Sequence, residues 1–240
     1  MKHLNTYKNE SFNMKPIGSY KNENFNSKSL TSYITEYIVK KKLDKPIDSE
    51  NHYKYCPKTK EELEKICIDL INNGNVDLNC IDVSNITDMQ ELFSNIDIKC
   101  SEDIQHIDID KWDVSNVTNM RAMFEECMDL DCDLSKWDVS KVKDMSYMFY
   151  GCRLFESDLS NWDVSNVETM IKMFYECRSF DSDLSNWNVS NVESMALMFE
   201  NCSNFTGKGL DNWNVSKLKN KILRIFNNCK KLKKIPDWNK

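Results

Sequence analysis

The sequence predicts an α/β solenoid, with a parallel sheet of one short strand per repeat on one side and short helices on the other. One segment recurs three times at a spacing of 25 residues: LSKWDVSKVKDMSYMFYGC from Leu134, LSNWDVSNVETMIKMFYEC from Leu159 and LSNWNVSNVESMALMFENC from Leu184. Self-similarity at a period of 20–50 residues indicates a repeat architecture. Stacked copies together bury an apolar face that one copy cannot bury alone. We expect the solenoid to coil with a right hand.

Each repeat contains a strand-like part and a helix-like part. A Trp lies two residues before a Val in a polar run, which is the alternation of a half-buried strand. Seven residues after that Trp stands a residue type that favours a helix N-cap. Met, Met, Phe and Cys then follow at i, i+3, i+4 and i+7, the spacing of one helical face. The expected cap positions are Asp88, Asn119, Asp144, Thr169, Ser194 and Asn220.

The chain divides into three expected regions. Residues 1–28 are polar and poor in aliphatic side chains, and we expect a flexible arm. Residues 29–75 are expected to form a helical N-terminal cap, with an amphipathic helix over residues 30–43 and a second helix starting at Thr59. Thr59 and Glu62 form a capping-box pattern, and Gly74 suits the position after the helix. Residues 76–240 are expected to form about seven layers of the solenoid.

Charge is distributed unevenly along the chain. Residues 59–216 contain 12 Lys and Arg against 31 Asp and Glu, whereas residues 217–240 contain 9 against 1 and residues 1–58 contain 11 against 6. The acidic middle argues against a nucleic-acid partner, which needs a basic surface. No run of 18 apolar residues predicts a membrane span. No signal peptide is recognised near Met1, so we expect a cytoplasmic protein, in which the ten cysteines are reduced and buried.

The pattern points away from an enzyme. The three histidines, His3, His52 and His106, lie outside the regular repeats, and no Ser, Cys or Glu is placed beside a base within them. Glycine is scarce, and no phosphate-binding loop is present. The column of Cys residues completes the apolar stripe of the expected helices, and a straight column does not make a tetrahedral zinc site. We expect no catalytic activity, no cofactor and no metal.

Two surfaces are candidate binding sites for a protein partner. On the predicted sheet face the positions beside each Trp form columns, some of them of stacked carboxylates. Stacked carboxylates repel one another, and we expect local hydrogen bonds, a basic partner or a cation to offset this repulsion. On the predicted helix face Tyr150 and Tyr175 occupy equivalent positions, either as a docking patch or as ordinary surface tyrosines. The sheet-face candidates are Asp113, Asp138, Asp163, Asn188, Asn214, Lys111 and Lys136.

The repeat pattern Leu-x-x-Trp-x-Val-Ser-x-Val-x-x-Met-x-x-Met-Phe-x-x-Cys resembles the BspA-like leucine-rich repeats of bacterial surface antigens, including the variant of mycoplasma-type lipoproteins. WDVSNVTNM at Trp112 and WDVSNVETM at Trp162 are very similar to the most typical segment of that variant. The resemblance covers about residues 76–240. It implies a leucine-rich-repeat-like solenoid and, as an alternative role, a surface-displayed adhesin that binds host proteins.

The sequence thus favours a non-catalytic protein–protein interaction module that binds its partner mainly through the predicted sheet face. We expect a monomer or a weakly self-associating protein. The alternative is an adhesin at the cell surface, which would be exported by a route that the sequence does not identify.

Overall fold

The structure is a computed structural model, and it describes residues 53–94, 107–218 and 224–239. All of these residues belong to one compact unit, residues 47–240. The expected arm, the amphipathic helix over residues 30–43 and the insertion around His106 lie outside the described residues, as does the expected cap at Asn220.

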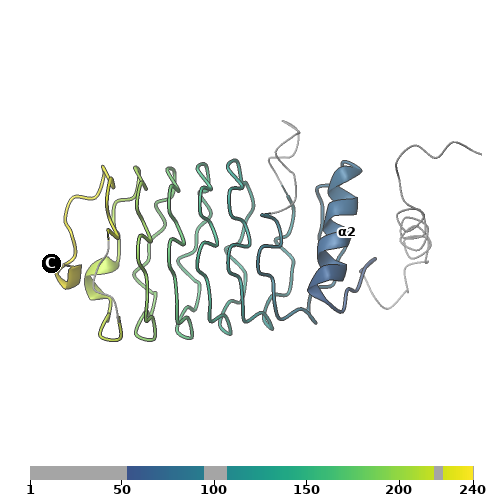
Figure 1. Ribbon diagram of the computed structural model, residues 1–240, viewed down its shortest axis with the longest axis horizontal. Coiled ribbons are helices and arrows are strands. Elements are labelled where there is room, and N and C mark those ends of the chain that lie inside the picture. Colours follow the sequence, from purple (N-terminus) through teal and green to yellow (C-terminus); the bar gives the residue numbers. More distant parts are fainter. Residues whose placement is uncertain (1–52, 95–106, 219–223, 240) are drawn as a thin grey trace, which may run out of the picture. The chain divides into compact units, whose positions relative to one another are not determined.

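Helix α2, Lys60–Asn72, is the α-helix of the described part of the chain and lies at one end of the stacked repeats (Figure 1). The Thr59 hydroxyl accepts a hydrogen bond from the Glu62 backbone N–H at 3.3 Å, and the Glu62 carboxylate accepts one from the Lys58 N–H at 2.8 Å. Gly74 follows the helix with φ 77°, and its N–H donates to the Ile71 carbonyl. The C-terminal end and the Thr59 bond follow the predicted capping chemistry, whereas Glu62 bonds the residue before the N-cap in place of Thr59 itself. Leu63, Cys67, Leu70 and Ile71 are buried.

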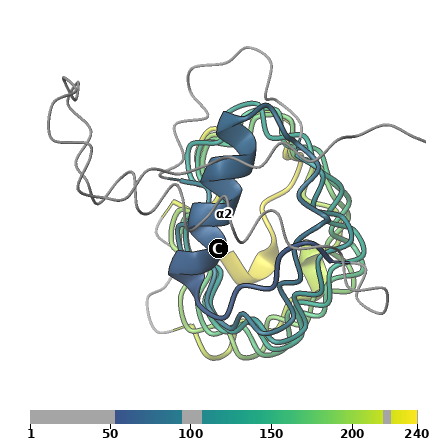
Figure 2. The same cartoon turned by 90° about the vertical axis from the view of Figure 1, so that its right-hand side faces the viewer.

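The repeats lie side by side and are joined by parallel backbone pairing. Figure 1 shows them as a row of similar loops, and in Figure 2, turned by 90°, they follow nearly the same outline. Bridges join residues one repeat apart: Asp88–Asn119, Asn119–Asp144, Asp144–Thr169 and Thr169–Ser194. These four bridges thus lie at positions expected to cap helices. The Trp-x-Val segments, expected to be the strands, contain no strand in the described residues.

The segments expected to be helices are successive tight turns. In the repeat that starts at Asp144, the Met148 N–H donates to the Met145 carbonyl and the Cys152 N–H to the Phe149 carbonyl. The third residue of each turn, Tyr147 and Gly151, has a positive φ of 62° and 75°. This is the conformation that type II turns require at that position. Two four-residue turns that bury both end residues produce the i, i+3, i+4, i+7 spacing on which the helix prediction was based.

Hydrogen bonds between repeats hold these turns in place. The N–H groups of Met145, Tyr147, Phe149 and Gly151 donate to carbonyl groups of the next repeat at 2.8–3.0 Å. Left-handed backbone costs a non-glycine residue roughly 1–2 kcal/mol. The same conformation recurs at Ala122, Lys172 and Leu197, each at the position of Tyr147 in its own repeat. The backbone hydrogen bonds between repeats offset the conformational cost of the left-handed residues, which would destabilise an isolated turn.

The core consists of columns of equivalent side chains. Phe93, Phe124, Phe149, Phe174, Phe199 and Phe226 stack with ring centroids 5.4–5.8 Å apart. Each Trp side chain of the regular repeats is buried and donates its indole N–H to a backbone carbonyl of the preceding repeat, as Trp162 does to Leu134 at 2.9 Å. The inward-facing residues predicted for the repeat from Leu159 are buried as expected: Leu159, Trp162, Val164, Val167, Met170, Met173, Phe174 and Cys177.

Two short 3-10 helices complete the described elements, η3 at Leu210–Asn212 and η4 at Asp237–Asn239. The first follows Gly209, whose φ is 84°. The second contains Trp238, whose indole N–H donates to the Leu210 carbonyl at 2.7 Å. The last repeat therefore uses the same tryptophan contact as the earlier ones.

Candidate functional sites

The carboxylate ladder consists of the equivalent residues Asp113, Asp138, Asp163, Asn188 and Asn214, all of them exposed. In each repeat the side-chain Oδ1 accepts a hydrogen bond from the backbone N–H of the Ser two residues later, at 3.0–3.2 Å. This is an Asx turn, which Asp and Asn form equally well. Each ladder residue thus forms a hydrogen bond within the turn of its own repeat. Local hydrogen bonding was one of the expected ways to offset the repulsion between the ladder carboxylates.

Hydrogen bonds and lysines influence the carboxylates in and near the ladder. Hydrogen bonds from Ser140 lower the pKa of Asp138, and the nearby cation that adds to this effect is Lys141. Lys136 instead contributes to the lowered pKa of Asp133, which is due mainly to hydrogen bonds from Ser135. The backbone N–H of Lys111 donates to the Asn79 side chain at 2.9 Å. The cations that act on these two carboxylates are thus Lys141 at Asp138 and Lys136 at Asp133.

The predicted tyrosine pair does form. The rings of Tyr150 and Tyr175 lie 4.8 Å apart between centroids, with an angle of 6° between their planes. Both side chains are half-buried. Burial, the neighbouring Tyr175 and nearby glutamates raise the pKa of Tyr150, so its hydroxyl stays protonated at neutral pH. The pair is an aromatic surface on two successive repeats.

Three further side chains extend this pair into what we call the tyrosine cluster, which comprises Arg121, Tyr147, Tyr150, Lys172 and Tyr175. The Lys172 Nζ lies 5.3–5.5 Å from the ring centroids of all three tyrosines. The Arg121 guanidinium lies 4.7 Å from the centroid of Tyr147. Both distances suit a cation–π interaction. Tyr147 and Lys172 were not predicted as site residues, although each precedes a predicted tyrosine by three residues.

Glutamates flank the tyrosine cluster. Glu125 occupies the position of Tyr150 in the preceding repeat, and burial followed by the charges of Glu126 and Glu91 raises the pKa of its carboxyl group. Glu126 lies against Gly151, within 3.2–3.4 Å of where a Cβ would stand. On the other flank Glu176 pairs with Arg153 and Arg178, both at 3.6 Å. The cluster therefore presents aromatic rings and cations inside an acidic border.

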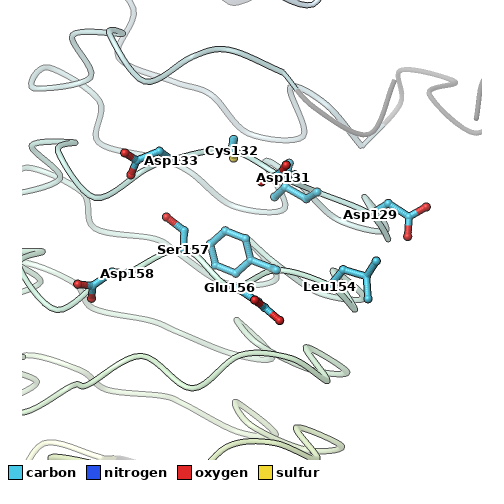
Figure 3. A pocket seen from close by; sticks show the side chains of 10 residues that line it. Asp129, Asp131, Cys132, Asp133, Leu154, Glu156, Ser157 and Asp158 are labelled. Carbon is cyan, nitrogen blue, oxygen red and sulfur yellow. The ribbon is translucent and has the colours of Figure 1, made fainter. Parts of the chain in front are cut away.

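An acidic groove lies between two repeats, where residues 129–133 run beside residues 154–158 (Figure 3). Its volume is about 570 Å³. The Leu134 N–H donates here to the Ser157 hydroxyl oxygen at 3.0 Å, so a side chain joins the two repeats. Leu130 and Phe155 form buried walls. The other lining residues include Asp129, Asp131, Asp133, Glu156 and Asp158. The sequence analysis did not single out these carboxylates, although they precede the repeated Leu at constant spacings.

The cysteine column is packed inside the fold. The thiol groups of Cys152, Cys177 and Cys202 donate to the carbonyl groups of Phe124, Phe149 and Phe174 at 2.8–3.0 Å. Burial raises the pKa of all three thiols far above the usual value. A buried thiol without a thiolate form is a poor nucleophile and a poor metal ligand. Within residues 53–94, 107–218 and 224–239 no group of three or more His, Cys, Asp or Glu is arranged to hold a metal ion.

The helices of the described ranges are all too short or too polar to cross a membrane.

Comparison with known proteins places the repeats in a family. A family model described as "Mycoplasma protein of unknown function, DUF285" matches residues 62–170, 89–210 and 155–240, in overlapping segments that suit a repeated unit. No curated protein and no solved structure matches the chain. The family model covers well over half of the chain, from the helix that precedes the first repeat to the last residue. The chain therefore belongs to the DUF285 family of Mycoplasma proteins of unknown function.

Proposed function

We propose that the protein is a non-catalytic protein–protein interaction module and that the tyrosine cluster is its main binding surface. The observation that carries this proposal is the stacked pair Tyr150–Tyr175 with Lys172 and Arg121 against the rings. Tyr and Arg are among the side chains most enriched at the energetic centres of protein interfaces. The cluster spans three successive repeats, so a partner would contact it as one continuous surface.

Preorganisation supports this choice. Side chains that are already ordered lose less conformational entropy when a partner binds. The tyrosine rings are held by one another and by Lys172, and the turns beneath them are fixed by backbone pairing to the next repeat. The carboxylate ladder is the weaker candidate, because Asp is depleted at the centres of protein interfaces, where Tyr and Arg are enriched. We therefore rank the tyrosine cluster above the ladder, the opposite of the order that the sequence favoured.

The test is a comparison of binding by three proteins. Once a partner is captured with the natural chain and purified, calorimetry measures its dissociation constant with the natural chain, with Tyr150→Ala/Tyr175→Ala and with Asp113→Asn/Asp138→Asn/Asp163→Asn. We expect the tyrosine variant to bind at least about tenfold more weakly, the loss of a moderate hot spot. The Asp→Asn variant keeps the Asx turns and should bind within about twofold. The reverse pattern would assign the partner to the ladder and contradict the proposal.

We further propose that the stacked repeats are a right-handed solenoid of the BspA-like leucine-rich-repeat type. The shared repeat pattern, the parallel bridges one repeat apart and the columns of Phe and Trp support it. The structure departs from the expected form in having turns in place of the short helices. A crystal structure of residues 53–240 with the opposite coiling or without stacked repeats would refute this proposal.

We also propose that the module is cytoplasmic. The resemblance to BspA-like proteins supports an alternative role as a surface-displayed adhesin. Protease treatment of intact cells separates the two. Degradation of the native protein while a cytoplasmic marker remains intact would support the adhesin, and complete protection would support the cytoplasmic module.

A further inference from the structure

The acidic groove ends in exposed apolar side chains. Leu154, which lines the groove, is 57% exposed, and Met128 on the neighbouring repeat is 41% exposed. The Leu154 N–H donates to the Met128 carbonyl at 3.1 Å, so the two residues lie side by side. Among the described residues, Met128, Leu154 and Ile235 are the exposed large apolar side chains. Two of these three therefore meet at one place, next to the buried walls of the groove.

The charge of the groove defines what it can accept. Five of its ten lining residues are Asp or Glu and none is basic. Hydrogen bonds from Ser135 and Ser160 lower the pKa of Asp133 and Asp158, which are therefore ionised at neutral pH. An occupant with aliphatic stems and cationic ends would bury its stems on Leu154 and Met128 while its charges meet the carboxylates. Lysine has this chemistry.

A segment with the complementary chemistry lies in the last repeat. Lys230, Lys231 and Lys233 are exposed, and Ile235 is the third exposed apolar side chain, at 49%. We call these four residues the basic turn. Lys234 is excluded from it, because its ammonium group pairs with Asp211 at 3.3 Å and Asp237 at 3.8 Å. The basic turn belongs to residues 217–240, where 9 Lys and Arg stand against 1 acidic residue.

The basic turn cannot reach the groove of its own molecule. Three steps along the Phe column separate the repeat of Phe149, which contributes one side of the groove, from the repeat of Phe226, which leads into the basic turn. The ring centroids are 5.6, 5.6 and 5.8 Å apart in these steps. The basic turn is also tied to its own repeat, since the Leu232 N–H donates to the Cys229 carbonyl and Lys234 is paired with Asp211. Any contact between the two is therefore between molecules.

We propose that the acidic groove binds the basic turn of a second copy of this chain, in a head-to-tail contact between Lys230, Lys231 and Lys233 and the groove carboxylates, with Ile235 against Leu154 and Met128. The two surfaces are different, so the contact does not close on itself as a symmetric dimer does. Each molecule keeps one free groove and one free basic turn, and association continues into open chains. The tyrosine cluster takes no part, so the proposal goes beyond the interaction described above and can fail independently of it.

Sedimentation equilibrium of the full chain tests the contact. At low ionic strength we expect the average mass to rise above the 28.3 kDa of one chain as the concentration increases. About 1 M NaCl should reverse the rise, because the screening length falls to about 3 Å. Asp131→Asn/Asp133→Asn/Asp158→Asn in the groove, or Lys230→Gln/Lys231→Gln/Lys233→Gln in the basic turn, should raise the dissociation constant by at least about tenfold.

The matched control is Asp113→Asn/Asp138→Asn/Asp163→Asn, which removes the same charge from the ladder and should associate like the natural chain. Asn keeps the turn hydrogen bonds, as Asn188 and Asn214 do in the natural sequence. The decisive sample is a mixture of the groove variant and the basic-turn variant. Each alone should be a monomer, whereas the mixture retains one intact groove and one intact basic turn and should form dimers and nothing larger. A natural chain that stays monomeric at low salt, association unaffected by both variants, or a mixture that remains monomeric would overturn the proposal.

Discussion

The indole N–H of Trp162 donates a hydrogen bond of 2.9 Å to the carbonyl oxygen of Leu134, 28 residues earlier in the chain. Trp112, Trp137, Trp187 and Trp213 make the same contact with the preceding repeat. One side chain thus fills the interior of its own repeat and satisfies a buried carbonyl of its neighbour. This explains why a buried aromatic residue with a polar atom occupies the position, since an indole N–H must find an acceptor when it is buried.

Two substitutions at Trp162 should separate packing from hydrogen bonding. Trp162→Ala should lower the free energy of unfolding by about 3–5 kcal/mol, because it leaves a cavity between repeats. Trp162→Phe keeps most of the ring but leaves the Leu134 carbonyl without its donor, at a cost of about 1–3 kcal/mol. Urea denaturation followed by circular dichroism measures both values. An effect of Trp162→Ala near zero would show that the side chain is not in the core.

Three glycines provide a graded test of the backbone. All three have positive φ, so a Cβ is strained at each, but its surroundings differ. Gly74→Ala, with nothing within 4 Å, should cost about 1 kcal/mol, and Gly151→Ala slightly more because the new Cβ meets the movable Glu126 carboxylate. Gly209→Ala would overlap the backbone nitrogen of Ser185 and should cost at least about 3 kcal/mol. Thermal unfolding of the three variants measures the order, and equal losses would contradict the packing at Gly209.

The thiols of the cysteine column should be inert in the folded protein. Cys152, Cys177 and Cys202 are buried with raised pKa values, whereas Cys56 is exposed. We expect iodoacetamide at pH 8 to alkylate Cys56 long before these three, because the thiolate is the reactive form. Peptide mass spectrometry of the folded and the urea-unfolded protein gives the rates. Equal rates at all four positions in the folded state would show that the column is open to solvent.

Acid should destabilise the protein through its Asx turns. Hydrogen bonds from the following Ser residues lower the folded-state pKa of Asp133, Asp138, Asp158 and Asp183 below the ordinary 3.8. A depressed folded pKa adds stability above the unfolded pKa, and this stability is lost as the pH falls through the folded value. Glu125, whose pKa is raised, acts in the opposite direction. The urea concentration at the midpoint of unfolding should therefore decrease as the pH is lowered below about 4. The decrease should be less steep in Asp138→Asn than in the natural chain.

Much of the core could be predicted from the sequence because inward positions are marked by residue type in every repeat. Leu159, Trp162, Met170 and Phe174 are buried as the pattern indicated. The conformation that joins them could not be predicted in the same way. The spacing of Met145, Met148, Phe149 and Cys152 fits a helical face and also the ends of two successive turns, and the choice depends on hydrogen bonds to the next repeat.

The candidate sites show the same division. Tyr150 and Tyr175 could be recognised as neighbours because they occupy equivalent positions one repeat apart. Lys172 could not, because its contact with both rings depends on a left-handed backbone, φ 53°, that few lysines adopt. The groove beside Leu154 was also missed. It lies between residues 129–133 and 154–158 of two repeats, and the arrangement of these two segments depends on contacts between repeats that residue types do not reveal.

Site-specific photo-crosslinking tests the central claim most directly, which is that the tyrosine cluster binds the partner. A photoreactive phenylalanine derivative replaces Tyr175 in one protein and Asp163 of the carboxylate ladder in another, and each is irradiated in the native cell extract. We predict a crosslinked protein from position 175 that is absent from position 163 and is suppressed when Tyr150→Ala is added. Crosslinking to a partner from position 163 but not from position 175 would contradict the account.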